Sequence, residues 1–166
     1  MKNTKSRPEV EPETYDEALT ALKTTLKTAG NEIDAQELVC QALYDNFEHY
    51  SWVGIYVVEG NELVLSAWSG LEETEHKRIA VGEGICGLAA ETGATEVVPD
   101  VSERAEFIAC FPSTRSEIVV PIHGAGGVIG EIDIDSDWLD AFDDRDRVFL
   151  EAVAARLAVV MEAPGE

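Results

Sequence analysis

Alternation of aliphatic and polar residues through the middle of the chain constrains its fold more than any other feature. Such a period of two places successive side chains on opposite faces of a sheet. Two pairs of alternating segments are separated by short glycine-containing turns, Glu59-Gly60-Asn61 and Gly124-Ala125-Gly126-Gly127, which predicts two β-hairpins. Strands are expected at residues 51–58, 62–69, 77–81, 95–98, 117–123 and 128–136.

Helical patterns flank these strands. A capping-box pattern at residues 14–17 predicts the start of a first helix, which should end at Gly30. A second helix is expected at residues 34–47, a short one at 88–91 and a last one at 143–161. The residues expected to face inward are Tyr15, Ala18, Leu19, Leu22 and Leu26 in the first helix, Leu38, Val39, Ala42 and Leu43 in the second, and Phe149, Val153, Leu157 and Val160 in the last.

The order of these elements predicts an α+β fold. Helices at both ends of the chain and strands between them favour a central antiparallel sheet with the helices packed on one face. A length of 166 residues suits one domain. We therefore expect a flexible N-terminal tail at residues 1–12 and a single domain at residues 13–163.

The charge of the chain excludes several classes of partner. Asp and Glu number 33 against 12 Lys and Arg, which gives a formal net charge of −21. Nucleic acid and anionic membrane surfaces are therefore poor partners. Such an acidic surface suits high salt, as in halophile-like proteins, or serves simply for solubility. No apolar run reaches membrane-spanning length and no signal-peptide pattern is present, so we expect a cytoplasmic protein.

Alternation also predicts which side chains share a face of the sheet. The aliphatic rows, placed against the helices, are Val53, Ile55 and Val57, then Ile118, Val120 and Ile122, then Ile132 and Ile134. The other face then collects Trp52, Tyr56, Glu117, Asp133 and Asp135, and Trp68 could join them. This face can be a pocket, with aromatic walls and carboxylates for an ammonium group, or an ordinary solvated face of an acidic protein. The two aromatic residues favour the pocket.

Three cysteines are few for a disulfide framework, and an odd number cannot all pair within the chain. They also lack the paired spacing of a structural zinc site. Cys40 lies in an amphipathic helix and is expected to pack as a small hydrophobe. Cys86 lies among glycines at a helix start, which suits either tight packing or a thiol activated by the helix dipole. Cys110 lies in a long polar loop (residues 99–116) near Arg115, where a reactive role is plausible. His76 and His123 are expected to be solvated surface histidines.

Several segments resemble the free methionine-(R)-sulfoxide reductases, which are GAF-domain enzymes. The resemblance covers about residues 14–157, and the segments at 108–110 and 116–122, with their spacing to Asp133 and Asp135, are specific to this group. The matching segments are Ser51-Trp-Val-Gly-Ile-Tyr56, Gly60-Asn-Glu-Leu-Val-Leu65, Gly82-Glu-Gly-Ile-Cys-Gly87, Val97-Val-Pro-Asp100, Ile108-Ala-Cys110, Ser116-Glu-Ile-Val-Val-Pro-Ile122 and Gly130-Glu-Ile-Asp-Ile-Asp-Ser136.

The resemblance implies a GAF-like fold with a loop-covered pocket and a role for each residue of the predicted face. Cys110 becomes the catalytic cysteine, which forms a sulfenic acid as free L-methionine-(R)-sulfoxide is reduced to L-methionine. Glu117, Asp133 and Asp135 become the acid-catalytic and substrate-binding carboxylates. Trp52 and Tyr56 become aromatic walls for the methyl-sulfoxide end. The resemblance implies no bound cofactor and no metal, but an external thiol reductant such as thioredoxin or a small thiol.

The chain departs from the family where Cys110 must be re-reduced. Many members carry a further cysteine about ten residues before the position of Cys86, and His76 holds that place here. The loop that contains His76, residues 71–77, is also about two residues longer than in those members. Phe111-Pro112 follows Cys110 where the family more often has a polar residue. Cys86 could act as the resolving thiol, or an external thiol could act directly. A non-catalytic GAF module that senses a small metabolite or oxidant stays the alternative, and a homodimer formed through the terminal helices is also open.

Overall fold

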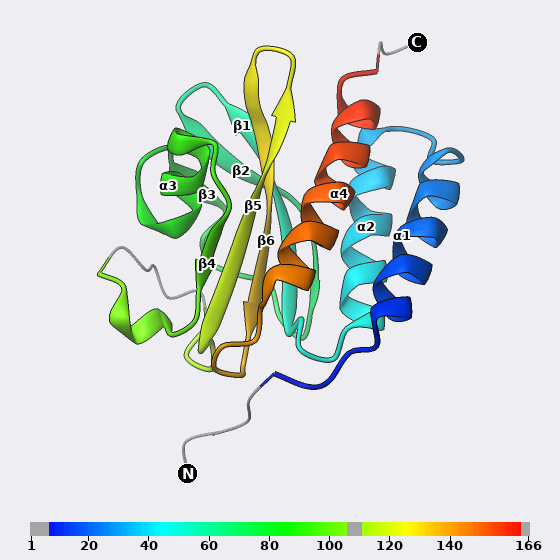
Figure 1. The fold of residues 1–166 in the computed structure, drawn as a ribbon. Helices are drawn as coiled ribbons and strands as arrows, with labels where there is room; N and C mark the ends of the chain where they lie inside the picture. The colour runs from blue at the N-terminus through cyan, green and yellow to red at the C-terminus, as the bar shows by residue number, and fades with distance from the viewer. Residues whose placement is uncertain (1–6, 106–110, 164–166) are drawn as a thin grey trace.

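The computed structural model describes residues 7–105 and 111–163, and it forms an α+β structure around one six-stranded sheet (Figure 1). The helices are α1 (Pro12–Leu26), α2 (Glu32–Asn46), α3 (Gly84–Thr92) and α4 (Asp144–Met161), with a 3-10 turn at Val101–Glu103. The strands are β1 (Trp52–Glu59), β2 (Glu62–Gly70), β3 (Arg78–Ala80), β4 (Glu96–Val98), β5 (Ser116–Gly124) and β6 (Gly127–Ser136).

The sheet has the order β3-β2-β1-β6-β5-β4, and every neighbouring pair is antiparallel. Both predicted hairpins are present, β1–β2 around Gly60 and β5–β6 around Ala125 and Gly126. Helices α1, α2 and α4 lie on one side of the sheet, and α3 lies on the other (Figure 1). The predicted fold class is therefore confirmed, including the separation of the terminal helices from the opposite face.

Two hydrophobic clusters divide between the faces as the alternation predicted. Val53 and Ile55 of β1 pack with the aliphatic rows of β5 and β6 against α1, α2 and α4. Trp52 and Tyr56, on the opposite face, pack with α3 and with residues of β2 to β5. Trp68 packs partly buried against this second cluster.

Two helix predictions need correction. Helix α1 begins at Pro12 with Glu11 as N-cap, so the pattern at residues 14–17 is not a capping box. A proline suits the first turn of a helix because its missing N–H would have no intrahelical partner there, and this starts the helix earlier. Helix α2 begins at Glu32, where the side chain of Asn31 accepts a hydrogen bond from the Asp34 amide.

The inward face of α2 and the length of α3 also differ from expectation. Leu38 is 39% exposed and lies at the edge of the buried stripe, whereas Val39 and Leu43 are buried. Helix α3 has nine residues and begins at Gly84, four residues before the predicted start. As a result, Cys86 lies inside the first turn of a helix.

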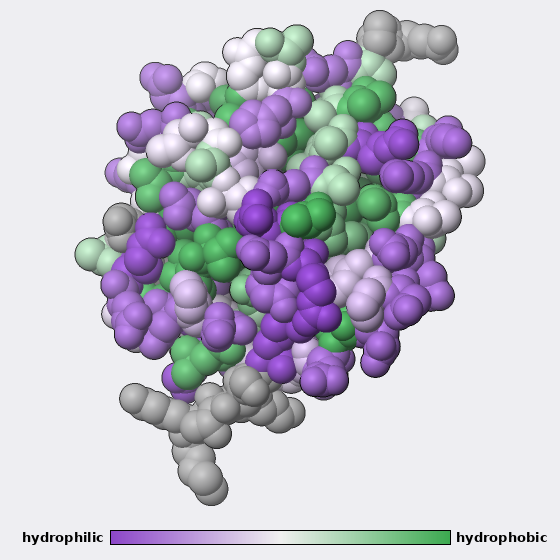
Figure 2. All heavy atoms as spheres, in the orientation of Figure 1, coloured by the Kyte–Doolittle hydropathy of each residue, from purple (hydrophilic) through white to green (hydrophobic). Residues whose placement is uncertain are grey.

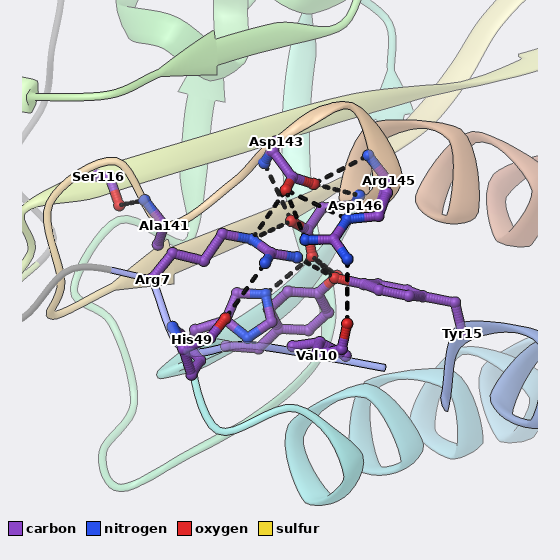
Figure 3. A network of polar contacts seen from close by, with 11 residues as sticks. Arg7, Val10, Tyr15, His49, Ser116, Ala141, Asp143, Arg145 and Asp146 are labelled. Atoms are coloured by element: carbon purple, nitrogen blue, oxygen red, sulfur yellow. Dashed lines mark hydrogen bonds and ion pairs between the residues drawn. The ribbon is translucent and has the colours of Figure 1, made fainter. Parts of the chain in front are cut away.

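Asp146, in the first turn of α4, is the centre of a buried polar network that holds three parts of the chain together (Figure 3). Its carboxylate accepts hydrogen bonds of 2.8 Å from the Tyr15 and Tyr50 hydroxyls and from His49 Nε2. Arg7 Nε donates a further bond of 3.1 Å and so ties the segment before α1 to the same group. His49 and Tyr50 lie three and two residues before Trp52, the first residue of β1, so the network holds the chain close to the start of the strand that carries the aromatic residues.

The exterior is mostly polar. Hydrophilic residues cover much of the face drawn in Figure 2, with hydrophobic residues interspersed among them. Few large apolar side chains of the described residues are strongly exposed; Leu71, Val148 and Val159 are the clearest examples. None of the helices in the described ranges combines the length with the hydrophobicity needed to traverse a bilayer.

Candidate active site

A row of carboxylates from two neighbouring strands lies on the sheet face opposite the terminal helices. Asp133 and Asp135 project from β6, and Glu117 of β5 is the cross-strand partner of Asp135. On the other side of β6, Trp52 is the partner of Asp135 and Tyr56 is the partner of Glu131. The structure thus brings together the five residues that the alternation assigned to this face, Trp52, Tyr56, Glu117, Asp133 and Asp135.

Glu131, which alternation also places opposite Ile132 and Ile134, is a member of this row that was not among the predicted site residues. It is fully buried on β6, two residues before Asp133, and therefore on the same face. The period-two pattern Glu131-Ile-Asp133-Ile-Asp135 carried the signal, since all three acids alternate with isoleucine. We call the sheet face formed by Trp52, Tyr56, Glu117, Glu131, Asp133 and Asp135 the acidic face.

The acidic face holds protons tightly. Burial raises the pKa of Glu117 well above its usual range, and the nearby Asp133 and Asp135 raise it further. Burial and then Asp133 likewise raise the pKa values of Glu131 and Asp135, and burial raises the pKa of Asp133 itself. Water cannot solvate the charges and each carboxylate repels the others, so the protonated form of each group is favoured.

Trp52 lies flat over the backbone of two neighbouring strands. A Cβ atom added at Gly54 would approach the Trp52 ring to 2.2 Å, and one at Gly70 would approach it to 2.5 Å. Both distances are far below van der Waals contact, so only glycine leaves room for the indole in this position. The indole Nε1 donates a 3.2 Å hydrogen bond to the Glu72 carbonyl, and Phe111 packs against the ring with centroids 5.7 Å apart.

The second aromatic residue, Tyr56, is fully buried and is tied to the same connection between β2 and β3. Its hydroxyl donates a 2.8 Å hydrogen bond to the His76 carbonyl oxygen. The His76 amide in turn donates to Thr74 Oγ1 at 3.1 Å. This connection, in which His76 stands where the family resemblance places a cysteine, is thus fastened to the acidic face by both aromatic residues.

Tight glycine packing seats α3 against the sheet. A Cβ atom at Gly87 would lie 2.6 Å from the Ala80 carbonyl oxygen and 2.9 Å from the Gly82 nitrogen. Gly82 and Gly84 have positive φ angles of 96° and 66°, which glycine adopts without strain. The glycines around Cys86 therefore serve close backbone packing, and this packing holds Cys86 over the carboxylates.

Cys86 is buried and its thiol is stabilised in the protonated form. Burial raises the pKa of Cys86 well above its usual range, and the charges of Asp133, Glu131, Glu117 and Asp135 raise it further. Of the two roles that the sequence left open for Cys86, this burial favours tight packing over a thiol activated by the helix dipole, because burial and the four nearby carboxylates all raise the pKa. Cys86 is thus a weak nucleophile in this conformation.

The other predicted residues are distributed as follows. Cys40 is fully buried in α2, as expected for a packing residue. His123 is exposed, whereas His76 is half-buried. Cys110 lies outside the described residues. Thr114, which follows it in the chain, donates a 3.5 Å hydrogen bond to Asp135 Oδ2, a contact that no sequence pattern indicated.

A small cavity of about 70 Å³ opens onto one end of the acidic face. Trp52, Phe111, Thr114 and Asp135 are among the residues that line it. Cys86, Glu117 and Asp133 each place one ligand atom within 4.8 Å of the others. The cavity reaches one carboxylate of the acidic face, Asp135, between Trp52 and the residues Phe111 to Thr114.

Comparisons with known proteins identify the family of the chain. A family model of the GAF domain matches residues 31–162. The free methionine-R-sulfoxide reductase of Saccharomyces cerevisiae is 38% identical over 75% of this chain and 70% of its own, and that of Escherichia coli is 34% identical over 72% and 71%. The crystal structure of the Neisseria meningitidis free methionine-R-sulfoxide reductase with its substrate is 33% identical, with a TM-score of 0.88 over 98% of this chain and 97% of that one. The chain therefore belongs to the GAF-domain family of free methionine-R-sulfoxide reductases.

Proposed function

We propose that the protein reduces free L-methionine-(R)-sulfoxide to L-methionine through a sulfenic acid on Cys110, with the acidic face as proton donor and substrate site. The observation that carries the proposal is the burial of Glu117, Asp133 and Asp135 side by side beneath an aromatic wall. A sensor module has no need of protonated carboxyl groups at the bottom of its pocket. Relatives that bear the reductase name support the same activity.

The first chemical step uses both the Cys110 thiol and a carboxyl group of the acidic face. The Cys110 thiolate attacks the sulfoxide sulfur while a protonated carboxyl group delivers its proton to the sulfoxide oxygen. The oxygen passes to the cysteine, so the sulfoxide becomes the thioether of methionine and Cys110 becomes a sulfenic acid. Raised pKa values keep a carboxyl group of Glu117, Asp133 or Asp135 protonated for this transfer.

Recognition of the free amino acid uses the remaining charge of the same face. A carboxylate that stays ionised can pair with the α-ammonium group, which a methionine sulfoxide within a polypeptide lacks. The Trp52 ring lines the cavity and offers its π-face to the polar, partly positive sulfur and its methyl group. Together these contacts favour the free sulfoxide over the peptide-bound one.

Recycling then needs a thiol from outside the acidic face. A reductant thiol condenses with the sulfenic acid to give a mixed disulfide and water, and a second thiol releases Cys110. Cys86, the internal candidate, is buried and its pKa is raised, so its thiolate is scarce. We therefore favour a thioredoxin-like protein or a small thiol that acts directly on Cys110.

The experiment is consumption of free L-methionine-(R)-sulfoxide by the full chain, first with dithiothreitol and then with thioredoxin. Turnover is expected for the wild type and for Cys40→Ser, a matched cysteine control on the helix side of the sheet. Cys110→Ser should show none, and the (S)-epimer and a peptide-bound sulfoxide should be poor substrates. Absence of turnover with either reductant would reject the enzyme, and activity in Cys110→Ser would reject the nucleophile.

The acidic role is tested by Glu117→Gln, Asp133→Asn and Asp135→Asn, which keep the side-chain shapes. General acid catalysis contributes on the order of 10²–10⁴-fold, so at least one variant should lose kcat by that factor. A carboxylate that only binds the ammonium group should raise KM instead. Wild-type kcat and KM in all three variants would contradict the proposal.

A further inference from the structure

Three metal-ligating side chains from three different elements meet at one point of the acidic face. Cys86 comes from α3, Glu117 from β5 and Asp133 from β6, and one ligand atom of each lies within 4.8 Å of the other two. We propose that Cys86, Glu117 and Asp133 form a binding site for a thiophilic divalent cation such as Zn²⁺, and that the bound ion inhibits the reductase. The inhibition, though not the binding, rests on the proposed function.

Unpartnered buried oxygens independently indicate a missing ligand. Asp133 and Glu131 are both fully buried, and no N–H or hydroxyl group of the described residues donates a hydrogen bond to either carboxylate; the groups beside them are the Cys86 thiol and, for Asp133, the Glu117 carboxyl group. Buried polar atoms in native proteins nearly always have a partner. Within the same ranges, no Lys, Arg or His side chain forms an ion pair with Glu117, Glu131, Asp133 or Asp135. Among the described residues these carboxylates therefore have no cationic partner, and a bound cation, either the substrate ammonium group or a metal ion, would supply one.

The ligand spacing suits a small tetrahedral ion. Zinc–sulfur bonds are about 2.3 Å and zinc–oxygen bonds about 2.0–2.2 Å, so ligand atoms around one zinc ion lie about 3.5 Å apart. Ligand atoms that start within 4.8 Å need to move by only about 1 Å.

The mixture of sulfur and oxygen selects the type of ion. Thiolate is a soft ligand, which favours Zn²⁺ or Cd²⁺ over Mg²⁺ and Ca²⁺, the ions preferred by all-oxygen sites. A substrate ammonium group can also neutralise the carboxylates, but it gains no bond from the thiol. Binding of the ion releases the Cys86 proton and any carboxyl proton that it displaces. The ion thus removes the proton donor of the proposed reaction and occupies the charge that binds the substrate.

Binding can be tested without any assay of activity. The variant C40A/C110S leaves Cys86 as the single cysteine of the full chain. Added Cd²⁺ should give a thiolate-to-metal charge-transfer absorption that saturates at one equivalent, and Cys86→Ser in this background should abolish it. Zn²⁺ affinity, measured against a chromophoric chelator, should fall at least tenfold in Asp133→Asn and stay unchanged in Glu83→Gln, an exposed acid next to α3.

Two results would overturn the binding site. One is no Cd²⁺ absorption in the Cys86-only variant when its near-ultraviolet circular dichroism matches that of the wild type. The other is an unchanged Zn²⁺ affinity in Asp133→Asn, a variant that keeps Cys86 and the shape of the carboxylate.

Inhibition is tested in the wild-type enzyme. Zn²⁺ should compete with methionine sulfoxide, and Cys86→Ser should raise its inhibition constant at least tenfold. Equal inhibition of Cys86→Ser would assign the effect to another residue, such as Cys110, and would reject the regulatory part. If the chain shows no turnover, the proposed function fails, but the Cd²⁺ and Zn²⁺ binding measurements still decide the site.

Discussion

Glu117 on β5 and Asp135 on β6 lie directly opposite each other in the antiparallel ladder, and their side chains are only 4% and 2% exposed. Two carboxylates in this arrangement destabilise the fold when both are ionised. Protonation removes this repulsion, so the acidic face links the stability of the fold to pH.

Glu117→Gln should stabilise the fold, most of all at alkaline pH. Burial and its neighbours raise the folded-state pKa of Glu117, so the wild type loses stability as pH rises from the ordinary carboxyl range through the folded pKa. A neutral amide removes this loss. At pH 8 we expect the variant to gain about 1–4 kcal/mol in urea denaturation, and near pH 4 almost nothing. The exposed Glu59→Gln serves as control, and a gain for Glu117→Gln that is independent of pH would contradict the argument.

Asp146→Asn should have the opposite effect. Burial alone would raise the pKa of Asp146, but hydrogen bonds from His49, the Asp143 amide and Tyr15 outweigh it and hold the pKa well below its usual range. Its stabilisation is therefore present above the ordinary carboxyl pKa and is lost as pH falls towards the folded value.

Removing this charge at neutral pH should cost about 3–5 kcal/mol in the free energy of unfolding, because the donors around it lose a charged acceptor. Asp144→Asn, whose side chain is 92% exposed on the same helical turn, should change it by less than about 0.5 kcal/mol. Equal effects of the two substitutions in a urea titration would reject the role given to the network.

Gly54→Ala should damage the substrate site. The added methyl group overlaps the Trp52 ring, so the indole must leave its place over the sheet. We expect KM for methionine sulfoxide to rise at least tenfold, together with a shift of the tryptophan emission maximum. Gly126→Ala provides the control, since an added Cβ there meets nothing within 4 Å. Wild-type kinetics in Gly54→Ala would remove Trp52 from the substrate wall.

Cys86 and Cys40 should be unreactive towards a disulfide reagent in the native protein. Both thiols are buried, and burial raises the pKa of each. In Cys110→Ser, therefore, neither thiol should react within minutes, and both should react once the chain is unfolded in guanidinium. One rapidly reacting thiol that disappears with Cys86→Ser would restore Cys86 as a resolving thiol.

Low salt should destabilise the protein. In a chain with a net charge of −21 the acidic side chains repel one another. The screening length grows from about 3 Å in molar salt to about 30 Å at 0.01 M, so this repulsion is strongest in dilute buffer. The melting temperature should therefore rise between dilute buffer and molar KCl. An unchanged melting temperature would leave the acidic surface as a solubility device alone.

Much of the site was predictable because its strands alternate strictly. Each of Trp52, Tyr56, Glu117, Asp133 and Asp135 lies on the expected face, since one buried face fixes the register of a strand. The Asp146 network was not predictable in this way. Its contacts join residues 97 and 131 positions apart, and no local pattern records such pairs.

Local rules failed where two of them competed or where tertiary burial decided the result. Pro12 and the pattern at residues 14–17 both indicate a helix start, and the proline prevailed. The helix dipole and burial act on Cys86 in opposite directions, and only the packing of α3 onto the acidic face shows that burial is the stronger.

The hydrogen bonds from Trp52 and Tyr56 to the connection between β2 and β3 end on main-chain carbonyl groups, those of Glu72 and His76. A carbonyl oxygen is common to every amino acid, so these two attachments do not depend on which side chains the connection carries. The connection can therefore carry either a cysteine or a histidine at position 76 and keep its position beside the acidic face. The main chain of this connection therefore holds it in place, whatever side chain stands at residue 76.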